Sequence, residues 1–101
     1  MLYNLLNRPA PGEEEAAISE AIGRDLSLYP SEFSLALLRI EGPWAGARII
    51  AHLANSDRMQ LLLRKAADEW TVVHYGRGST AGEWMAEGAP AELAQWLEAV
   101  W

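Results

Sequence analysis

The sequence predicts an α+β domain: an N-terminal helix packed on a four-stranded antiparallel meander sheet, followed by a C-terminal amphipathic helix. Three observations support this prediction. Apolar residues recur at helical spacing near both ends of the chain and at strand spacing between residues 33 and 77. Short turn signals separate the strand-like segments, which favours antiparallel neighbours. The length of 101 residues suits one small domain with a single core.

Residues 1–12 are predicted to form an N-terminal arm and linker, and residues 13–101 a single domain. The linker NRPAPG contains two prolines and a glycine, which disfavour regular structure. A helix is expected to begin at Glu13, because three successive glutamates there would face the positive end of the helix dipole. Its apolar stripe consists of Ile18, Ala21, Ile22, Leu26 and Tyr29, and Pro30 ends it.

Four strands are expected in the middle of the chain. They are Phe33–Glu41, Trp44–Ala54, Arg58–Ala66 and Trp70–Arg77. The segments between them contain glycine, proline, asparagine or aspartate, which are typical turn residues. Residues 79–89 are expected to form a loop. Pro90 then opens the C-terminal helix, whose apolar residues follow helical spacing up to Trp101.

The second and third strands each present one wholly apolar face. These residues are Ala45, Ala47, Ile49, Ala51 and Leu53 on one strand, and Met59, Leu61 and Leu63 on the other. A three-residue loop at 55–57 would pair Leu53 with Met59 and Ile49 with Leu63, so that both apolar faces coincide. Because alanines make this face shallow, we expect the first helix to pack across it.

The opposite face of the same two strands combines aliphatic and basic residues. We call it the mixed face; its members are Arg48, Ile50, His52, Gln60, Leu62 and Arg64. Aliphatic side chains framed by arginines are unusual on a fully solvated face. Either the Trp-rich C-terminal helix covers this face, or a second copy or a partner protein does. The mixed face is therefore the predicted partner-binding site.

The orientation of His74 in the fourth strand depends on the turn at residues 67–68. A two-residue turn pairs Leu61 with His74 and points the imidazole toward the first helix. A three-residue turn pairs Leu61 with Tyr75 and sends His74 to the mixed face. In the first arrangement, Trp70, His74 and Tyr75 would line a pocket between helix and sheet. Such a pocket predicts an alternative function, small-molecule binding or catalysis.

The composition excludes several kinds of chemistry. The absence of cysteine excludes disulfides, thiolate nucleophiles and cysteine-ligated metals. The two histidines, His52 and His74, would lie about 10 Å apart across the sheet, with no acidic residue at strand spacing beside either. No nucleophile-elbow sequence is present. We therefore expect no metal or other cofactor, and no residue is assigned a catalytic role.

The formal net charge of −6 is unevenly distributed, with acidic ends around a mildly basic middle. No cluster of lysines and arginines is present, so nucleic acid is not an expected partner. No apolar run approaches the length that crosses a membrane. The segment MLYNLL lacks the basic lead and the long apolar core of a signal peptide. A cytoplasmic location is expected, or a secreted or periplasmic one if an export signal has been removed.

The segment Trp70–Gly76 resembles the closing strand W-x-V-V-x-x-G of small bacterial domains with cystatin-like or nuclear-transport-factor-like architecture. Upstream, Gly42–Ala45 and Leu61–Arg64 are similar to the G-x-W-A and LLRR segments of those domains. The resemblance spans residues 16–98 and implies a helix on a curled antiparallel sheet. Enzymes of the broader fold place Asp, His or Tyr inside the curled sheet. The comparable residues here are His52, His74 and Tyr75, without a matching acid, so the resemblance implies no activity.

The sequence thus predicts a non-enzymatic protein-interaction domain that acts through the mixed face and nearby tryptophans. The expected partner is a second copy, forming a homodimer, or an unidentified protein. Besides the helix–sheet pocket, two alternatives remain open. One is a small acidic inhibitor or immunity-type protein, because such proteins are often small and acidic. The other is a subunit of a larger assembly, with the apolar MLYNLL arm docking on a neighbour.

Overall fold

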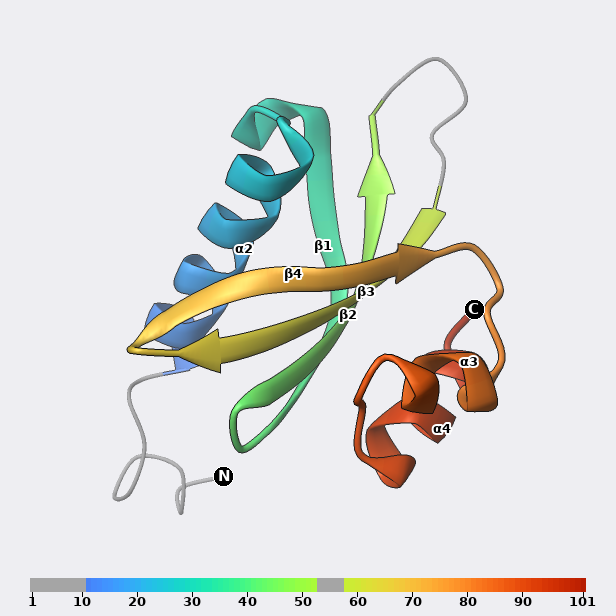
Figure 1. Cartoon of the computed structure of the whole chain (residues 1–101). Helices are drawn as coiled ribbons and strands as arrows, with labels where there is room; N and C mark the ends of the chain where they lie inside the picture. The colour runs from blue at the N-terminus through green and yellow to red at the C-terminus, as the bar shows by residue number, and fades with distance from the viewer. Residues whose placement is uncertain (1–10, 53–57) are drawn as a thin grey trace.

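The computed structural model describes residues 11–52 and 58–101, and it confirms the predicted fold class (Figure 1). Helix α2 is followed by a short 3-10 helix η1, four strands and two short helices. Their bounds are α2 Pro11–Leu26, η1 Pro30–Glu32, β1 Phe33–Glu41, β2 Trp44–Ala51, β3 Arg58–Ala66, β4 Glu69–Gly76, α3 Ala81–Ala86 and α4 Ala91–Ala99. The strands form one antiparallel sheet in the order β1-β2-β3-β4. Residues 1–10 of the predicted arm and linker at 1–12, and the predicted loop at 55–57, lie outside the described residues.

Helix α2 begins at Pro11, two residues before the predicted start at Glu13. Proline is favourable in the first turn of a helix, because its missing N–H would have no partner there. The helix ends at Leu26 rather than at Tyr29. Ser27 adopts a positive φ of 58°, and the backbone N–H of Leu28 donates to the carbonyl of Gly23 at 2.8 Å. This is the Schellman arrangement that closes a helix.

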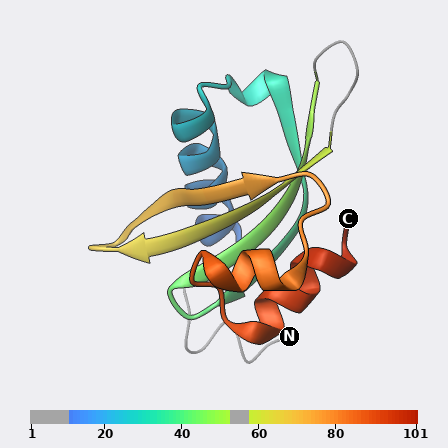
Figure 2. The same cartoon turned by 45° about the vertical axis from the view of Figure 1, so that its right-hand side comes forward.

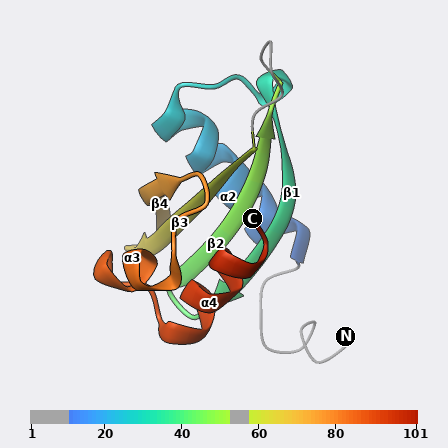
Figure 3. The same cartoon turned by 90° about the vertical axis from the view of Figure 1, so that its right-hand side faces the viewer.

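The sheet lies between α2 on one face and the α3–α4 pair on the other (Figures 2 and 3). The first core joins α2 to the alanine face and contains Ile18, Ala21, Ile22, Phe33, Ala45, Ala47, Ile49, Leu61, Leu63 and Trp70. The prediction that the first helix packs across this shallow face is therefore confirmed. The second core joins Leu62 to the C-terminal helices and contains Trp84, Ala89, Leu93, Ala94 and Leu97.

The close approach of α4 to the sheet depends on Gly46 in β2. A Cβ at this position would lie 2.9 Å from Leu93 Cδ1 and 3.1 Å from Leu97 Cδ2. Such contacts are shorter than van der Waals separation, so a larger residue would displace the helix. A glycine in a strand often marks a site where another element packs closely.

The predicted pairing of β2 with β3 is wrong in register. Ile49 pairs with Met59 rather than with Leu63, and Ala45 takes Leu63 as its partner. Strand β2 ends at Ala51 and not at Ala54, so the connection to β3 is longer than three residues. The partner of Ile49 has moved by four residues, an even number, and an even shift keeps every side chain on its original face.

The predicted loop at 79–89 contains helix α3, which is a second correction. The Thr80 hydroxyl accepts a hydrogen bond from the Glu83 backbone N–H at 3.2 Å. The Glu83 carboxylate in turn accepts one from the Thr80 backbone N–H at 2.7 Å. This capping box stabilises the first turn of a helix, and its T-x-x-E signature is visible in the sequence.

Candidate functional site

Strand β4 forms one edge of the sheet and contains the irregularity that orients His74. The turn at Ala67 and Asp68 has two residues, both with positive φ, and Leu63 pairs with Val72. Beyond this pair the register shifts, and Leu62 pairs with His74. Val73 is the extra residue of a β-bulge, which locally breaks the alternation of side chains.

The bulge sends His74 to the face covered by α3. Its ring is edge-on to that of Trp84, with centroids 5.6 Å apart, and its Nδ1 lies 3.9 Å from a carboxylate oxygen of Glu87. The prediction that a two-residue turn would point His74 toward the first helix is wrong. The turn does have two residues, but the bulge after Val72 moves the His74 side chain to the opposite face of the sheet. Tyr75 pairs with Leu61, as the alternative three-residue turn predicts.

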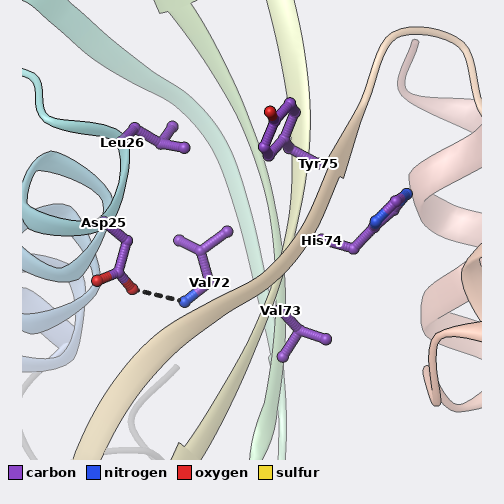
Figure 4. Close-up of a pocket in the computed structure, with 6 residues that line it drawn as sticks. All are labelled: Asp25, Leu26, Val72, Val73, His74 and Tyr75. Atoms are coloured by element: carbon purple, nitrogen blue, oxygen red, sulfur yellow. Dashed lines mark hydrogen bonds between the residues drawn. The ribbon is translucent and has the colours of Figure 1, made fainter.

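A groove of about 390 Å³ lies between the C-terminal end of α2 and β4. We call it the β4 groove; it is lined by Asp25, Leu26, Val72, Val73, His74 and Tyr75 (Figure 4). Val73 is 40% exposed and Tyr75 55% exposed. Figure 4 shows the His74 ring turned toward α3, on the other side of the strand from Asp25. Apart from Asp25, the side chains available inside the groove are apolar or aromatic.

Two side chains at the end of α2 bind backbone groups of this edge strand. Asp25 Oδ2 accepts a hydrogen bond from the Val72 backbone N–H at 2.9 Å, and Arg24 donates through Nη2 to the Trp70 carbonyl at 2.7 Å. Arg24 Nε also donates to Asp25 Oδ1 at 2.9 Å. The side-chain hydrogen bond from Arg24 lowers the pKa of Asp25, and the N–H of Val72 lowers it further. Asp25 is therefore an ionised carboxylate with both oxygens hydrogen-bonded.

Replacing Asp25 with alanine is expected to lower the free energy of unfolding by about 1 kcal/mol at neutral pH, because the Val72 N–H and Arg24 lose their partner. The pKa of Asp25 is lower in the folded protein than its ordinary value of 3.8. Its stabilisation is therefore present above that value and is lost as the pH falls through the folded-state pKa. Urea denaturation of wild type and variant from neutral to acidic pH measures this difference.

Glu15→Ala is the matched control, since Glu15 is another exposed acid of α2. It should leave the free energy of unfolding unchanged within about 0.5 kcal/mol. A difference between wild type and Asp25→Ala that persisted at acidic pH would show that the carboxylate's charge is not its source.

The three residues predicted to line a helix–sheet pocket are not brought together. Trp70 is buried in the first core, with its indole Nε1 donating to Glu14 at 3.3 Å. His74 faces α3, and only Tyr75 extends over the β4 groove. Sequence reasoning missed Asp25 and Leu26 as lining residues. Both belong to the last turn of α2, and nothing local indicates which strand that turn contacts.

The centre of the mixed face is covered by the C-terminal helices, which is one of the two arrangements that the sequence left open. Gln60 and Leu62 are fully buried. The Gln60 side chain donates to the Leu97 carbonyl and accepts from the backbone N–H groups of Gly78 at 2.8 Å and Ser79 at 3.3 Å. These hydrogen bonds connect α4 and the segment before α3 to strand β3 of the sheet.

The periphery of the mixed face is engaged in contacts within the chain. Arg48 donates through Nη1 to the Val100 carbonyl at 2.8 Å, and Ile50 is partly buried. His52 shares a hydrogen bond of 2.6 Å with the Ser34 hydroxyl. The Arg64 guanidinium lies 5.1 Å from the centroid of the Trp44 ring, in cation–π geometry. His52 and Arg64 remain exposed.

Two further findings concern the described part of the chain. No group of three or more His, Asp or Glu side chains in residues 11–52 and 58–101 could hold a metal ion. None of the helices in the same ranges is long and apolar enough to cross a membrane.

The fold and the β4 groove define the protein as an α+β domain with a largely apolar groove at one edge of its sheet. No protein-family model matches the chain, and no curated protein or solved structure matches it. The resemblance to cystatin-like and nuclear-transport-factor-like domains therefore stays a prediction.

Proposed function

We propose that this protein is a non-enzymatic interaction domain that binds a protein partner through the apolar side chains of the β4 groove. The observation that supports this proposal is the exposure of Tyr75, at 55%, beside the partly buried Leu26. Val73, 40% exposed, extends from the other side of the same strand (Figure 4). Exposed apolar and aromatic side chains gathered on a strand are typical of interaction sites. Tyrosine in particular combines a large apolar surface with a polar tip.

The electrostatics of the groove favour binding over catalysis. Its one carboxylate, Asp25, is hydrogen-bonded through both oxygens to Arg24 and the backbone of Val72. A general acid or base must instead reach the substrate and exchange a proton with it. Because Arg24 and Asp25 already bind the Trp70 carbonyl and the Val72 N–H, a partner would contact side chains here rather than extend the sheet.

The first partner to test is a second copy of the chain. A two-fold axis would bring the same exposed groove of each copy together, so Tyr75 of one copy would meet Tyr75 of the other. In the mixed face, Gln60 and Leu62 are buried and could not contribute at such an interface, whereas His52 and Arg64 are exposed.

The experiment is size-exclusion chromatography with light scattering over a concentration series. The wild type is expected to show the mass of a dimer that dissociates on dilution. Tyr75→Asp should remain monomeric, because the interface would bury an unpaired charge. Met85→Asp is the matched control: Met85 is 44% exposed on α3 and does not line the groove, so this variant should dimerise like the wild type.

A different partner protein is tested in cells that produce the chain. A photo-crosslinking phenylalanine analogue replaces Tyr75, and in the control it replaces the exposed Glu98 of α4. An adduct of one defined mass at position 75 but not at position 98 is expected. A strict monomer in solution, together with no adduct at position 75, contradicts the proposed function.

A further inference from the structure

The two edges of the sheet differ in how α2 covers them. At the β4 edge, Arg24 and Asp25 bind the Trp70 carbonyl and the Val72 N–H. Within residues 11–52 and 58–101, strand β1 is the opposite edge of the sheet and pairs with β2 (Figure 3). Between α2 and β1 lies a second groove of about 490 Å³, which we call the β1 groove. Both edges therefore border a groove, and at the β4 edge side chains of α2 also bind backbone groups of the strand.

The β1 groove has an apolar floor and a wall of small residues. The helix contributes Ala16, Ser19, Glu20 and Gly23, and the other side consists of Leu28, Pro30, Phe33 and Leu35. Short side chains on α2 leave space beside the strand, and Phe33 and Leu35 face into that space from β1. The volume lies within the range of about 300–1,000 Å³ that is usual for ligand clefts.

We propose that the β1 groove binds an extended apolar segment of a partner protein, which adds to β1 as an additional strand. A strand laid along this edge of the sheet would form backbone hydrogen bonds with β1. Because side chains of a strand alternate between its two faces, every second side chain of the segment would enter the groove beside α2. The segment therefore alternates apolar residues with residues of any type.

A bulge in β1 limits where this pairing takes place. The register of β1 with β2 shifts between Leu35 and Leu37, so the strand is regular next to the groove and irregular beyond it. Bulges in edge strands oppose uncontrolled edge-to-edge association. The added segment would therefore pair with Phe33–Leu35, the part of β1 that lines the groove.

The charge beside the groove specifies the partner further. Glu20 lines the groove and is exposed on α2. The one basic residue of this helix, Arg24, is directed to the opposite edge, where it binds Trp70 and Glu69. A carboxylate in the wall of an apolar groove favours a segment that carries a lysine or arginine next to its apolar residues.

The probe is a phage-displayed library of random twelve-residue peptides, selected on the full-length chain. The consensus peptide is then synthesised with a fluorescent label and its affinity is measured by anisotropy. Selected peptides are expected to alternate apolar residues and to carry a lysine or arginine. Ala16→Trp should fill the groove and weaken binding by about tenfold or more, which corresponds to about 1.4 kcal/mol.

Matched variants on the same helix distinguish an effect of the groove itself from the effect of adding an indole or a lysine elsewhere on α2. Ala17→Trp adds the same indole one residue away, at an exposed position outside the groove, and should leave the affinity unchanged. Glu20→Lys should weaken binding severalfold, whereas Glu15→Lys, outside the groove, should not. Thermal denaturation of all four variants establishes that they are folded.

Hydrogen exchange identifies the edge that the peptide occupies. Peptide binding should slow amide exchange in β1 and leave β4 unchanged. Selection of no peptide, equal binding by Ala16→Trp and wild type, or protection of β4 in place of β1 would each overturn the proposal. If Ala16→Trp instead abolishes self-association in light scattering, a second copy occupies the groove and the peptide proposal fails. Tyr75→Asp should not affect peptide binding, so this result is independent of the proposed function.

Discussion

Replacing Trp84 with alanine is expected to lower the free energy of unfolding by about 3–5 kcal/mol, the usual cost of emptying a large buried aromatic site. Trp84 is fully buried, and it is the one buried residue of α3. A helix of six residues is too short to be stable without tertiary contacts, so α3 depends on this indole. Urea denaturation followed by circular dichroism measures the loss.

Met85→Ala is the control for Trp84→Ala, because Met85 is the next residue of the same helix but is 44% exposed. Its effect should stay within about 0.5 kcal/mol. If Trp84→Ala is unfolded without urea, Trp84→Phe supplies the measurement. Phenylalanine keeps part of the buried aromatic ring. It also removes an indole N–H that is buried without a hydrogen-bond partner in the described structure. Trp84→Phe should therefore lower the free energy of unfolding by less than Trp84→Ala does. Equal stability of Trp84→Ala and Met85→Ala would show that the second core contributes little.

The sequence predicted strands β1 and β3 with their observed bounds, because short turns at residues 42–43 and 67–68 delimit them locally. The register of β2 with β3 could not be predicted in the same way. Their connection spans residues 52–57, and the alternation of apolar residues has a period of two. Any even shift therefore satisfies the pattern equally well, and tertiary packing selects one of them.

The face of the sheet on which His74 lies could not be predicted, because a run of strand-forming residues does not indicate where a bulge occurs. Val72 and Val73 have the same β-propensity, and either could have been the extra residue. The bulge brings Val72 and Tyr75, which are three residues apart, opposite Leu63 and Leu61, both of which belong to the first core. Regular alternation would have placed Val72 and Tyr75 on opposite faces.

The candidate site depends on contacts between residues far apart in the sequence. Asp25 and Val72 are separated by 47 positions, and no local pattern specifies that the end of α2 meets the middle of β4. The apolar spacing of the first helix predicted Leu26 as a core residue. Leu26 does pack, partly buried, against the first core, and the end of the helix at this residue also places it beside the exposed Tyr75.

Replacing Gln60 with leucine is expected to lower the free energy of unfolding by about 2–4 kcal/mol. The substitution removes three hydrogen-bond partners at once, those of the Leu97 carbonyl and of the Gly78 and Ser79 N–H groups. Leaving a buried polar group without a partner costs about 1–3 kcal/mol, and less where water reaches it, as it does at Gly78. Leucine is similar in size to glutamine, so the hydrogen bonds and not the volume account for the loss.

Gln95→Leu is the control for Gln60→Leu, because Gln95 lies on the exposed side of α4 and its replacement should change stability by no more than about 0.5 kcal/mol. Hydrogen exchange provides a local measurement. In Gln60→Leu the amides of Gly78 and Ser79 should exchange faster, while those of α2 should lose only the protection that follows from lower global stability. Unchanged exchange at Gly78 and Ser79 would mean that the Gln60 side chain does not hold the C-terminal helices on the sheet. In that case Leu62, Leu93 and Leu97, rather than the buried amide, position α4 on the sheet.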